Sequence, residues 1–352
     1  MTSPLRRFTR ATAVVLLAFG ALHASVSSAD AASTTTSIGA GIRGPSGLDA
    51  TVIATGLKHV SALATDADGR VWAATAAASD TGKDAVYLVS DSGATPTKVV
   101  TDVHTPLGLV WVGETLYVSE ANAVLALSGF DGTTFASRAT VVTFPDGTGE
   151  VNGITAGPDG RLYVGISAPC DACTPTAESS ASIVSFRLDG TDLQTFASGI
   201  RAAIGLAFFP GTDHLFVTMN QRDDLGKKTP GDWLAIVRAG ESWGFPACYG
   251  QDGGKCADVP RPVATLDPHA AVSGVAIVTG QLGSSIGTGA AVAEWVTGKV
   301  RWVRLTATGD GYSGTSTSFL SGFENPVPVL LDHRGALLVG DWTSGKIYRI
   351  SA

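Results

Sequence analysis

The chain has 352 residues, of which 44% are hydrophobic and 16% are charged, and it contains 43 glycines. A chain of this length can bury a large core, and all-β folds of this size often form one domain. The net charge is −7, and no basic run follows the N-terminus. These features exclude the basic surface that nucleic-acid binding requires, so we expect no nucleic-acid partner.

Residues 1–31 have the features of a secretory signal peptide. Arg6, Arg7 and Arg10 precede the apolar run AVVLLAFGAL, and Ala29-Asp30-Ala31 fits a small-residue cleavage site. The apolar run is about a dozen residues long, which is too short to span a bilayer. We therefore expect export, cleavage near Ala31, and a mature protein without a membrane span.

Two short segments come before the main body of the chain. Residues 32–48 are rich in Ser, Thr and Gly, and we expect them to form a flexible lead-in. The segment ATVIATG (50–56) has the apolar, β-branched composition of a strand. It stands alone, without a partner strand next to it in the sequence.

A repeat occupies the rest of the chain. Six segments share a short apolar strand, a polar turn with Gly or Asp, and a second apolar strand, as in ALATDADGRVWAAT, GITAGPDGRLYVGIS and PVLLDHRGALLVGDW. A third strand follows in most copies and a fourth in many, with a period of about 45 residues that is typical of propeller blades. The last copy ends after three strands, so the strand at 50–56 is expected to complete it. The sequence therefore predicts an all-β, six-bladed propeller over residues 49–352, closed by an N-terminal strand.

Four cysteines follow the expected cleavage site: Cys170, Cys173, Cys248 and Cys256. Four cysteines allow three pairings, and an oxidising compartment favours disulfides. We expect Cys170–Cys173 and Cys248–Cys256, because each pair closes a short loop. A redox role for the CDAC segment and a zinc site made of all four cysteines are the alternatives.

Polar residues precede the first strand of each repeat. In a propeller these positions lie on one face, beside the central channel, where a ligand site would form. The positions are Lys58, His59, His104, Thr105, Glu150, Asn152, Arg201, His269, Ser273, Glu324 and Asn325. The alternative is that they are solvated loop residues.

The segments FASGIRAAIGLAFFPGTDHLFVTMNQRDDLG and PGDWLAIVRAGESWGFPACYG resemble the soluble glucose/sorbosone dehydrogenase family. The resemblance implies a six-bladed propeller that oxidises sugars with pyrroloquinoline quinone (PQQ) and calcium and reduces an external electron acceptor. By position, the implied cofactor contacts are Arg201, Asn220, Gln221, Arg222 and Trp243. Asp223 and Asp224 would supply the oxygen ligands that calcium prefers. An ion-pair brace within the NQRDDLG loop is the alternative role for these charges.

The sequence departs from the family at the base that takes the hydroxyl proton. The family's catalytic His would fall at Gly149, and its quinone-contacting Lys near Val296. Glu150, His104 and His269 are the candidates for a replacement base.

Three functions remain open at this point. The first is a secreted sugar dehydrogenase that uses PQQ and calcium with an altered catalytic site. The second is a metal-dependent lactonase-type hydrolase, in which Glu150, Asn152, His59 and His269 hold a divalent ion that acts as a Lewis acid. The third is a binding propeller that has lost its chemistry.

Overall fold

The structure is a computed structural model that describes residues 35–90, 95–251 and 256–352. The signal peptide expected over residues 1–31 lies outside these ranges. The described residues form 26 β-strands and one short 3-10 helix, Gly226–Lys228. None of the described helical structure is long and apolar enough to cross a membrane.

The first three blades follow one another along the chain as four-stranded antiparallel sheets. Blade 1 contains β4 (Val60–Thr65), β5 (Val71–Thr75), β6 (Ala85–Val89) and β7 (Thr97–Val100). Blade 2 contains β8 (Gly108–Val112), β9 (Thr115–Glu120), β10 (Ala123–Phe130) and β11 (Phe135–Thr143). Blade 3 contains β12 (Val151–Ala156), β13 (Arg161–Ile166), β14 (Ser182–Arg187) and β15 (Gln194–Ser198).

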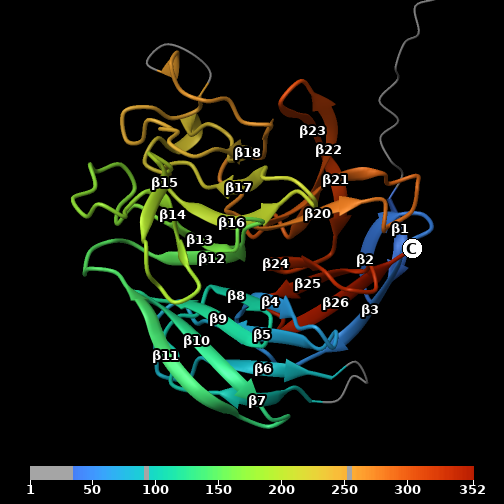
Figure 1. Cartoon of the computed structure of the whole chain (residues 1–352). Helices are drawn as coiled ribbons and strands as arrows, with labels where there is room; N and C mark the ends of the chain where they lie inside the picture. Colours follow the sequence, from blue (N-terminus) through green and yellow to red (C-terminus); the bar gives the residue numbers. More distant parts are fainter. Residues whose placement is uncertain (1–34, 91–94, 252–255) are drawn as a thin grey trace, which may run out of the picture. The chain divides into compact units, whose positions relative to one another are not determined.

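The last three blades complete the circle (Figure 1). Blade 4 contains β16 (Ala203–Phe208), β17 (Leu215–Met219), β18 (Trp233–Val237) and β19 (Ala264–Thr265). Blade 5 contains β20 (Val272–Thr279), β21 (Thr288–Glu294), β22 (Lys299–Thr308) and β23 (Gly311–Ser321). Blade 6 contains β24 (Pro326–Leu331), β25 (Leu337–Asp341), β26 (Lys346–Ser351) and the N-terminal strand β3 (Asp49–Ala54).

Closure of the ring follows the prediction. Strand β3 pairs antiparallel with β26, with Ala50 opposite Ile350, so that the start of the propeller completes its last blade. The first strands contact one another in the circular order β4, β8, β12, β16, β20, β24 and back to β4. The six-bladed, all-β architecture is confirmed.

The expected flexible lead-in is wrong for the described part of residues 32–48. Strands β1 (Thr35–Gly39) and β2 (Ile42–Pro45) form a hairpin, and Arg43 of β2 pairs with Ser321 of β23. The hairpin adds two strands to the outer edge of blade 5. The physical reason is that Ile38 and Ile42 are buried in the same apolar cluster as Leu320.

Glycine allows the first strands to approach one another closely around the channel. A Cβ on Gly153 of β12 would lie 2.4 Å from the carbonyl oxygen of Ile204 in β16. A Cβ on Gly205 of β16 would lie 2.4 Å from the carbonyl oxygen of Ser273 in β20. Neighbouring first strands are therefore too close together at these glycines for a side chain to fit between them, which keeps the channel narrow below its mouth.

Buried carboxylates hold the loops that precede the first strands. The Asp84 carboxylate accepts the N–H of Thr105, and the Glu120 carboxylate accepts the N–H of His104. In blade 6, the buried Asp341 carboxylate accepts the N–H of Glu324 at 2.7 Å. The Asp232 and Glu294 carboxylates accept the N–H groups of Val272, at the start of β20, and of Asp267, in the loop before it. The loops before β8, β20 and β24 are therefore fixed through their backbones.

Candidate functional site at the channel mouth

A cavity of about 1010 Å³ opens at the face where the first strands begin. Six ionisable groups belong to its lining: Glu150, Asp171, Arg201, Asp223, Asp232 and His269. Four of these side chains are carboxylates, so the wall is rich in oxygen donors. The volume is in the range of small-molecule and cofactor sites.

Glu150 lies on the loop before β12 and is exposed to the cavity. Its backbone carbonyl accepts the N–H of Ser167 at 3.0 Å, which fixes the position of the residue. Its carboxylate forms no hydrogen bond or ion pair with the described part of the chain. Of the three predicted bases, Glu150 is thus the one whose proton-accepting atoms are free.

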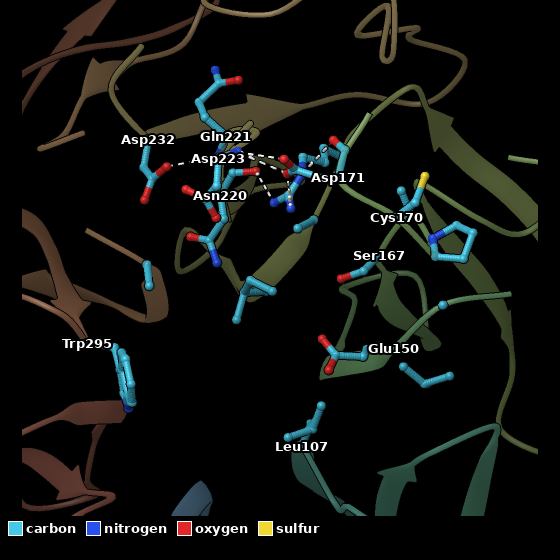
Figure 2. Close-up of a pocket in the computed structure, with 18 of the residues that line it drawn as sticks. Leu107, Glu150, Ser167, Cys170, Asp171, Asn220, Gln221, Asp223, Asp232 and Trp295 are labelled. Carbon is cyan, nitrogen blue, oxygen red and sulfur yellow. Dashed lines mark hydrogen bonds and ion pairs between the residues drawn. The ribbon is translucent and has the colours of Figure 1, made fainter. Parts of the chain in front are cut away.

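Trp295 faces Glu150 from the opposite side of the cavity (Figure 2). It directly follows β21, and its ring packs edge-on against Trp342, with centroids 6.1 Å apart. A flat, half-buried indole of this kind can stack on a sugar ring or on another planar group. The sequence contained a signal for this position, because Trp295 and Trp342 both follow the buried carboxylate that ends a second strand.

Arg201 lines the cavity as expected, but its guanidinium already has a partner. Its terminal nitrogen lies 2.6 Å from the carboxylate of Asp171, and its Nε donates to the Asp171 carbonyl oxygen at 3.1 Å. A third bond goes to the carbonyl oxygen of Asn220 at 3.2 Å. Asp171 was not a predicted site residue.

His269 lines the cavity, but both of its ring nitrogens are engaged. Nε2 lies 2.8 Å from the carbonyl oxygen of Gly226, and Nδ1 lies 2.7 Å from the carboxylate of Asp223. Both partners are acceptors, so the ring satisfies them fully only as the imidazolium. The Gly226 carbonyl and the Asp223 carboxylate accordingly raise the pKa of His269 above its usual value. With both ring nitrogens engaged, His269 has no free nitrogen that could act as a base.

His104 is not among the residues that line the cavity. Its Nδ1 lies 2.6 Å from the carboxylate of Asp80, in the preceding blade, and its side chain is half-exposed. The hydrogen bond to Asp80 raises the pKa of His104 above its usual value. The neighbouring Thr105 reaches the cavity instead.

The structure divides the NQRDDLG loop into two parts. Asn220, Gln221 and Asp223 line the cavity, and the buried Oδ1 of Asn220 has no hydrogen-bond partner among the described residues. Arg222 and Asp224 do not line it, and they form a bidentate ion pair with two contacts of 2.6 Å. The two expected calcium ligands are thereby separated: Asp223 faces the cavity and Asp224 pairs with Arg222.

Trp243 is fully buried and stacks on Trp233, with ring centroids 4.6 Å apart. Its Nε1 donates to the carboxylate of Glu241 at 3.3 Å. The expected contact with a cofactor therefore lacks an accessible ring face, and the residue packs the core of blade 4.

The residues proposed for a lactonase-type metal site are not brought together. Asn152 donates to Ser167 Oγ at 2.8 Å, and the His59 ring packs on Trp342 at 4.2 Å. Only Glu150 and His269 of that set line the cavity. Across the described ranges, no group of three or more His, Cys, Asp or Glu side chains is placed to hold a metal ion.

Gly149 occupies the position that the family resemblance assigns to the catalytic His. Its φ is +108°, and a Cβ there would lie 2.1 Å from the carbonyl oxygen of Ser167. The backbone is therefore closed to any side chain at this position. No side chain at this position can therefore act as a base.

Both expected disulfides are present. Cys170 pairs with Cys173 and Cys248 with Cys256, with Cα–Cα distances of 5.8 and 5.3 Å. No cysteine is left free for the zinc site considered above. The Cys170–Cys173 loop borders the cavity and carries Asp171.

Asp232, which lines the cavity, should make the free energy of unfolding depend on pH. Burial raises the pKa of its carboxyl group to about 6, against the effect of two backbone N–H bonds. The folded state then binds a proton that the unfolded chain releases near pH 3.8, so this group favours folding at low pH. Its contribution is lost as the pH rises through about 6, by about 3 kcal/mol in all.

We therefore expect Asp232→Asn to remove this loss. In calcium-free buffer, the unfolding free energy of the wild type relative to the variant should fall between about pH 4 and pH 7. Urea denaturation at a series of pH values measures the difference. A difference that stays constant with pH would contradict the assignment.

The fold and the cavity define the class of the protein: it is a six-bladed β-propeller with a polar cavity at the mouth of its channel. A family model described as the SMP-30/Gluconolactonase/LRE-like region matches residues 58–221. A comparison with curated protein sequences finds no match.

Two solved sugar dehydrogenases and a solved carbohydrate-active enzyme of family AA12 have the same fold. The holo form of the pyranose dehydrogenase PQQ domain from Coprinopsis cinerea is 16% identical, covers 88% of this chain and 97% of its own, and has a TM-score of 0.72. The PQQ-bound aldose sugar dehydrogenase from Streptomyces coelicolor is 20% identical over 88% of this chain and 99% of its own, with a TM-score of 0.67. A calcium structure of the Trichoderma reesei family AA12 enzyme is 16% identical over 88% and 96%, with a TM-score of 0.70. The resemblance noted in the sequence is confirmed at the level of the fold.

Proposed function

We propose that the protein is an exported, quinone-dependent sugar dehydrogenase in which Glu150 acts as the base. The observation that carries the proposal is the unpartnered Glu150 carboxylate in a cavity that also presents Trp295 and Arg201. The shared fold of solved sugar dehydrogenases supports it. Export rests on the sequence of residues 1–31, and the two disulfides support an oxidising compartment.

Individual groups of the cavity wall have the chemistry that calcium and a carboxylate-bearing quinone require. The unpaired Asn220 oxygen and the carboxylates of Asp223 and Asp232 are hard oxygen donors of the kind that calcium prefers. Arg201, which Asp171 engages, carries a guanidinium that matches a carboxylate, and Trp295 offers a flat apolar face. The bound quinone would supply the capacity to accept two electrons from the sugar.

The protein's own side chains would do the remaining work. Glu150 would take the proton of the sugar hydroxyl that is oxidised, because it is the accessible carboxylate without a partner. Trp295, across the cavity, would hold the apolar face of the sugar ring toward Glu150. The His269 ring would hold Asp223 in place through its 2.7 Å contact.

Titration with PQQ and calcium tests the cofactor assignment. Binding should quench tryptophan fluorescence, because Trp295 lines the cavity, and should stabilise the fold by about 2.7 kcal/mol at a ligand concentration of 100 Kd. A calcium chelator should reverse both effects. Turnover of aldoses with a redox dye then tests the activity, and the absence of saturable PQQ binding would overturn the proposal.

Hydrolysis of sugar lactones is a second candidate, favoured by the family-model match over residues 58–221. It predicts lactone turnover that depends on an added divalent metal and not on PQQ. Metal analysis and a lactone assay on the same preparation separate the two functions. Ligand binding without either activity would identify a binding propeller.

A further inference from the structure

Three hydrogen-bond donors from blade 4 converge on one carboxylate at the cavity wall. The donors are the Arg201 guanidinium and the backbone N–H groups of Asp223 and Asp224, and the acceptor is Asp171. Figure 2 shows Asp171 beside Asp223 at the cavity wall. The contacts are 2.6 Å from Arg201, 2.9 and 3.0 Å from the Asp223 N–H, and 2.7 Å from the Asp224 N–H. A guanidinium beside adjacent backbone N–H groups is an arrangement that recognises carboxylates.

The occupant of this arrangement belongs to a different blade. Asp171 lies inside the Cys170–Cys173 disulfide loop, which follows β13 of blade 3. Its carbonyl oxygen also accepts the Nε bond of Arg201. One residue therefore engages two sides of the guanidinium and reaches across a blade boundary to do so.

The contact is accessible to competing ligands. Arg201, Asp171 and Asp223 all line the cavity, and the Asp171 and Arg201 side chains are 31% and 18% exposed. An ion pair with this exposure is weakened by solvent and contributes little to stability. A carboxylate that arrives from the cavity can therefore exchange with Asp171 at modest cost.

We propose that Asp171 is a tethered plug in a carboxylate-binding site formed by Arg201 and the N–H groups of Asp223 and Asp224. A small ligand that carries a carboxylate must displace the plug, whereas a neutral sugar need not. With the plug in place, the cavity discriminates against sugar acids in favour of neutral sugars. The inference rests partly on the proposed function, because a quinone carboxylate would need the same donors.

Removal of the plug should increase affinity for acids. A tethered group competes at an effective concentration on the order of millimolar or higher. A ligand that binds only the open state gains affinity by the reciprocal of the open fraction. We therefore expect Asp171→Ala to bind gluconate at least about tenfold more tightly than the wild type. Affinity for glucose, which carries no carboxylate, should not change.

Isothermal titration calorimetry with gluconate and glucose measures both affinities in the full-length exported protein, without cofactor. Asp192→Ala is the matched control, since Asp192 forms an equivalent 2.6 Å ion pair with Arg161 and neither residue lines the cavity. It should leave gluconate binding unchanged. Adding Arg201→Gln to Asp171→Ala should abolish the gain, and a thiol assay verifies that the disulfides remain intact.

An Asp171→Ala protein that is folded but binds gluconate no better than the wild type would overturn the plug. If this variant does not fold, Asp171→Asn, which removes the charge and keeps the size, should show a smaller gain in the same direction, and its failure to do so would also overturn the plug. Titration with PQQ distinguishes the two proposals. Tighter gluconate binding by the variant without PQQ binding supports the plug and contradicts the cofactor assignment. PQQ binding without tighter gluconate binding supports the cofactor assignment and contradicts the plug.

Discussion

Glu150→Gln should lower the turnover of aldoses by about 10²- to 10⁴-fold, which is the usual contribution of a general base. The amide keeps the size and the backbone contacts of Glu150 but cannot accept the hydroxyl proton. Because the carboxylate forms no bond with the described residues, its loss should leave the melting temperature unchanged. Steady-state kinetics with a redox dye and a thermal melt of the same protein measure the two effects.

Glu114→Gln is the matched control for this experiment. Glu114 is exposed in the turn between β8 and β9, at the opposite ends of these strands from the cavity, and is not a lining residue. This variant should retain full turnover. Equal activity of Glu150→Gln and the wild type would show that another group takes the proton.

Gly149→Ala should destabilise the protein by at least about 3 kcal/mol, since it combines left-handed backbone strain with a steric clash. The added Cβ would lie 2.1 Å from the carbonyl oxygen of Ser167, and backbone atoms cannot rotate away as a side chain can. Gly149→His, which introduces the residue expected from the family resemblance, should destabilise the protein at least as much. Urea denaturation followed by fluorescence measures the loss.

Gly147→Ala isolates the clash from the strain. Gly147 also has a positive φ, +79°, but a Cβ there meets nothing within 4 Å. This control should lose only about 1–2 kcal/mol, the cost of the left-handed conformation alone. Similar losses in the two variants would mean that the loop before β12 moves to accommodate a side chain at position 149.

The fold was predictable because its signals are local and repeated. Strand, turn and strand recur six times, and the incomplete last copy indicated that β3 would close the ring, as its pairing with β26 confirms. The disulfides were predictable for the same reason, since each pair closes a short loop. The hairpin of β1 and β2 was missed because Ser, Thr and Gly dominate its composition. Two isoleucines, Ile38 and Ile42, are nevertheless enough to anchor it on blade 5.

Four of the six loops that the repeat placed at the channel mouth line the cavity, those before β8, β12, β16 and β20, but the repeat did not predict which side chains would point into it. His104 occupies the expected loop, yet Asp80 of the preceding blade holds its ring. Asp171 meets Arg201 from 30 residues away, through a loop whose path no periodic pattern specifies. Side-chain partners that cross a blade boundary depend on loop conformation, which the sequence does not encode locally.

The buried carboxylates that hold loops at this face of the ring determine which substitutions the site can accept. The loops before β8 and β24 are held by Asp84, Glu120 and Asp341 through backbone N–H groups, whatever side chains those loops carry. In the loop before β8, Thr105 lines the cavity while Asp84 accepts its backbone N–H, so its side chain can be exchanged without loss of that hydrogen bond. The backbone of such a loop is held independently of the side chains that it carries. Substitution of those side chains can therefore change ligand preference at little cost in stability.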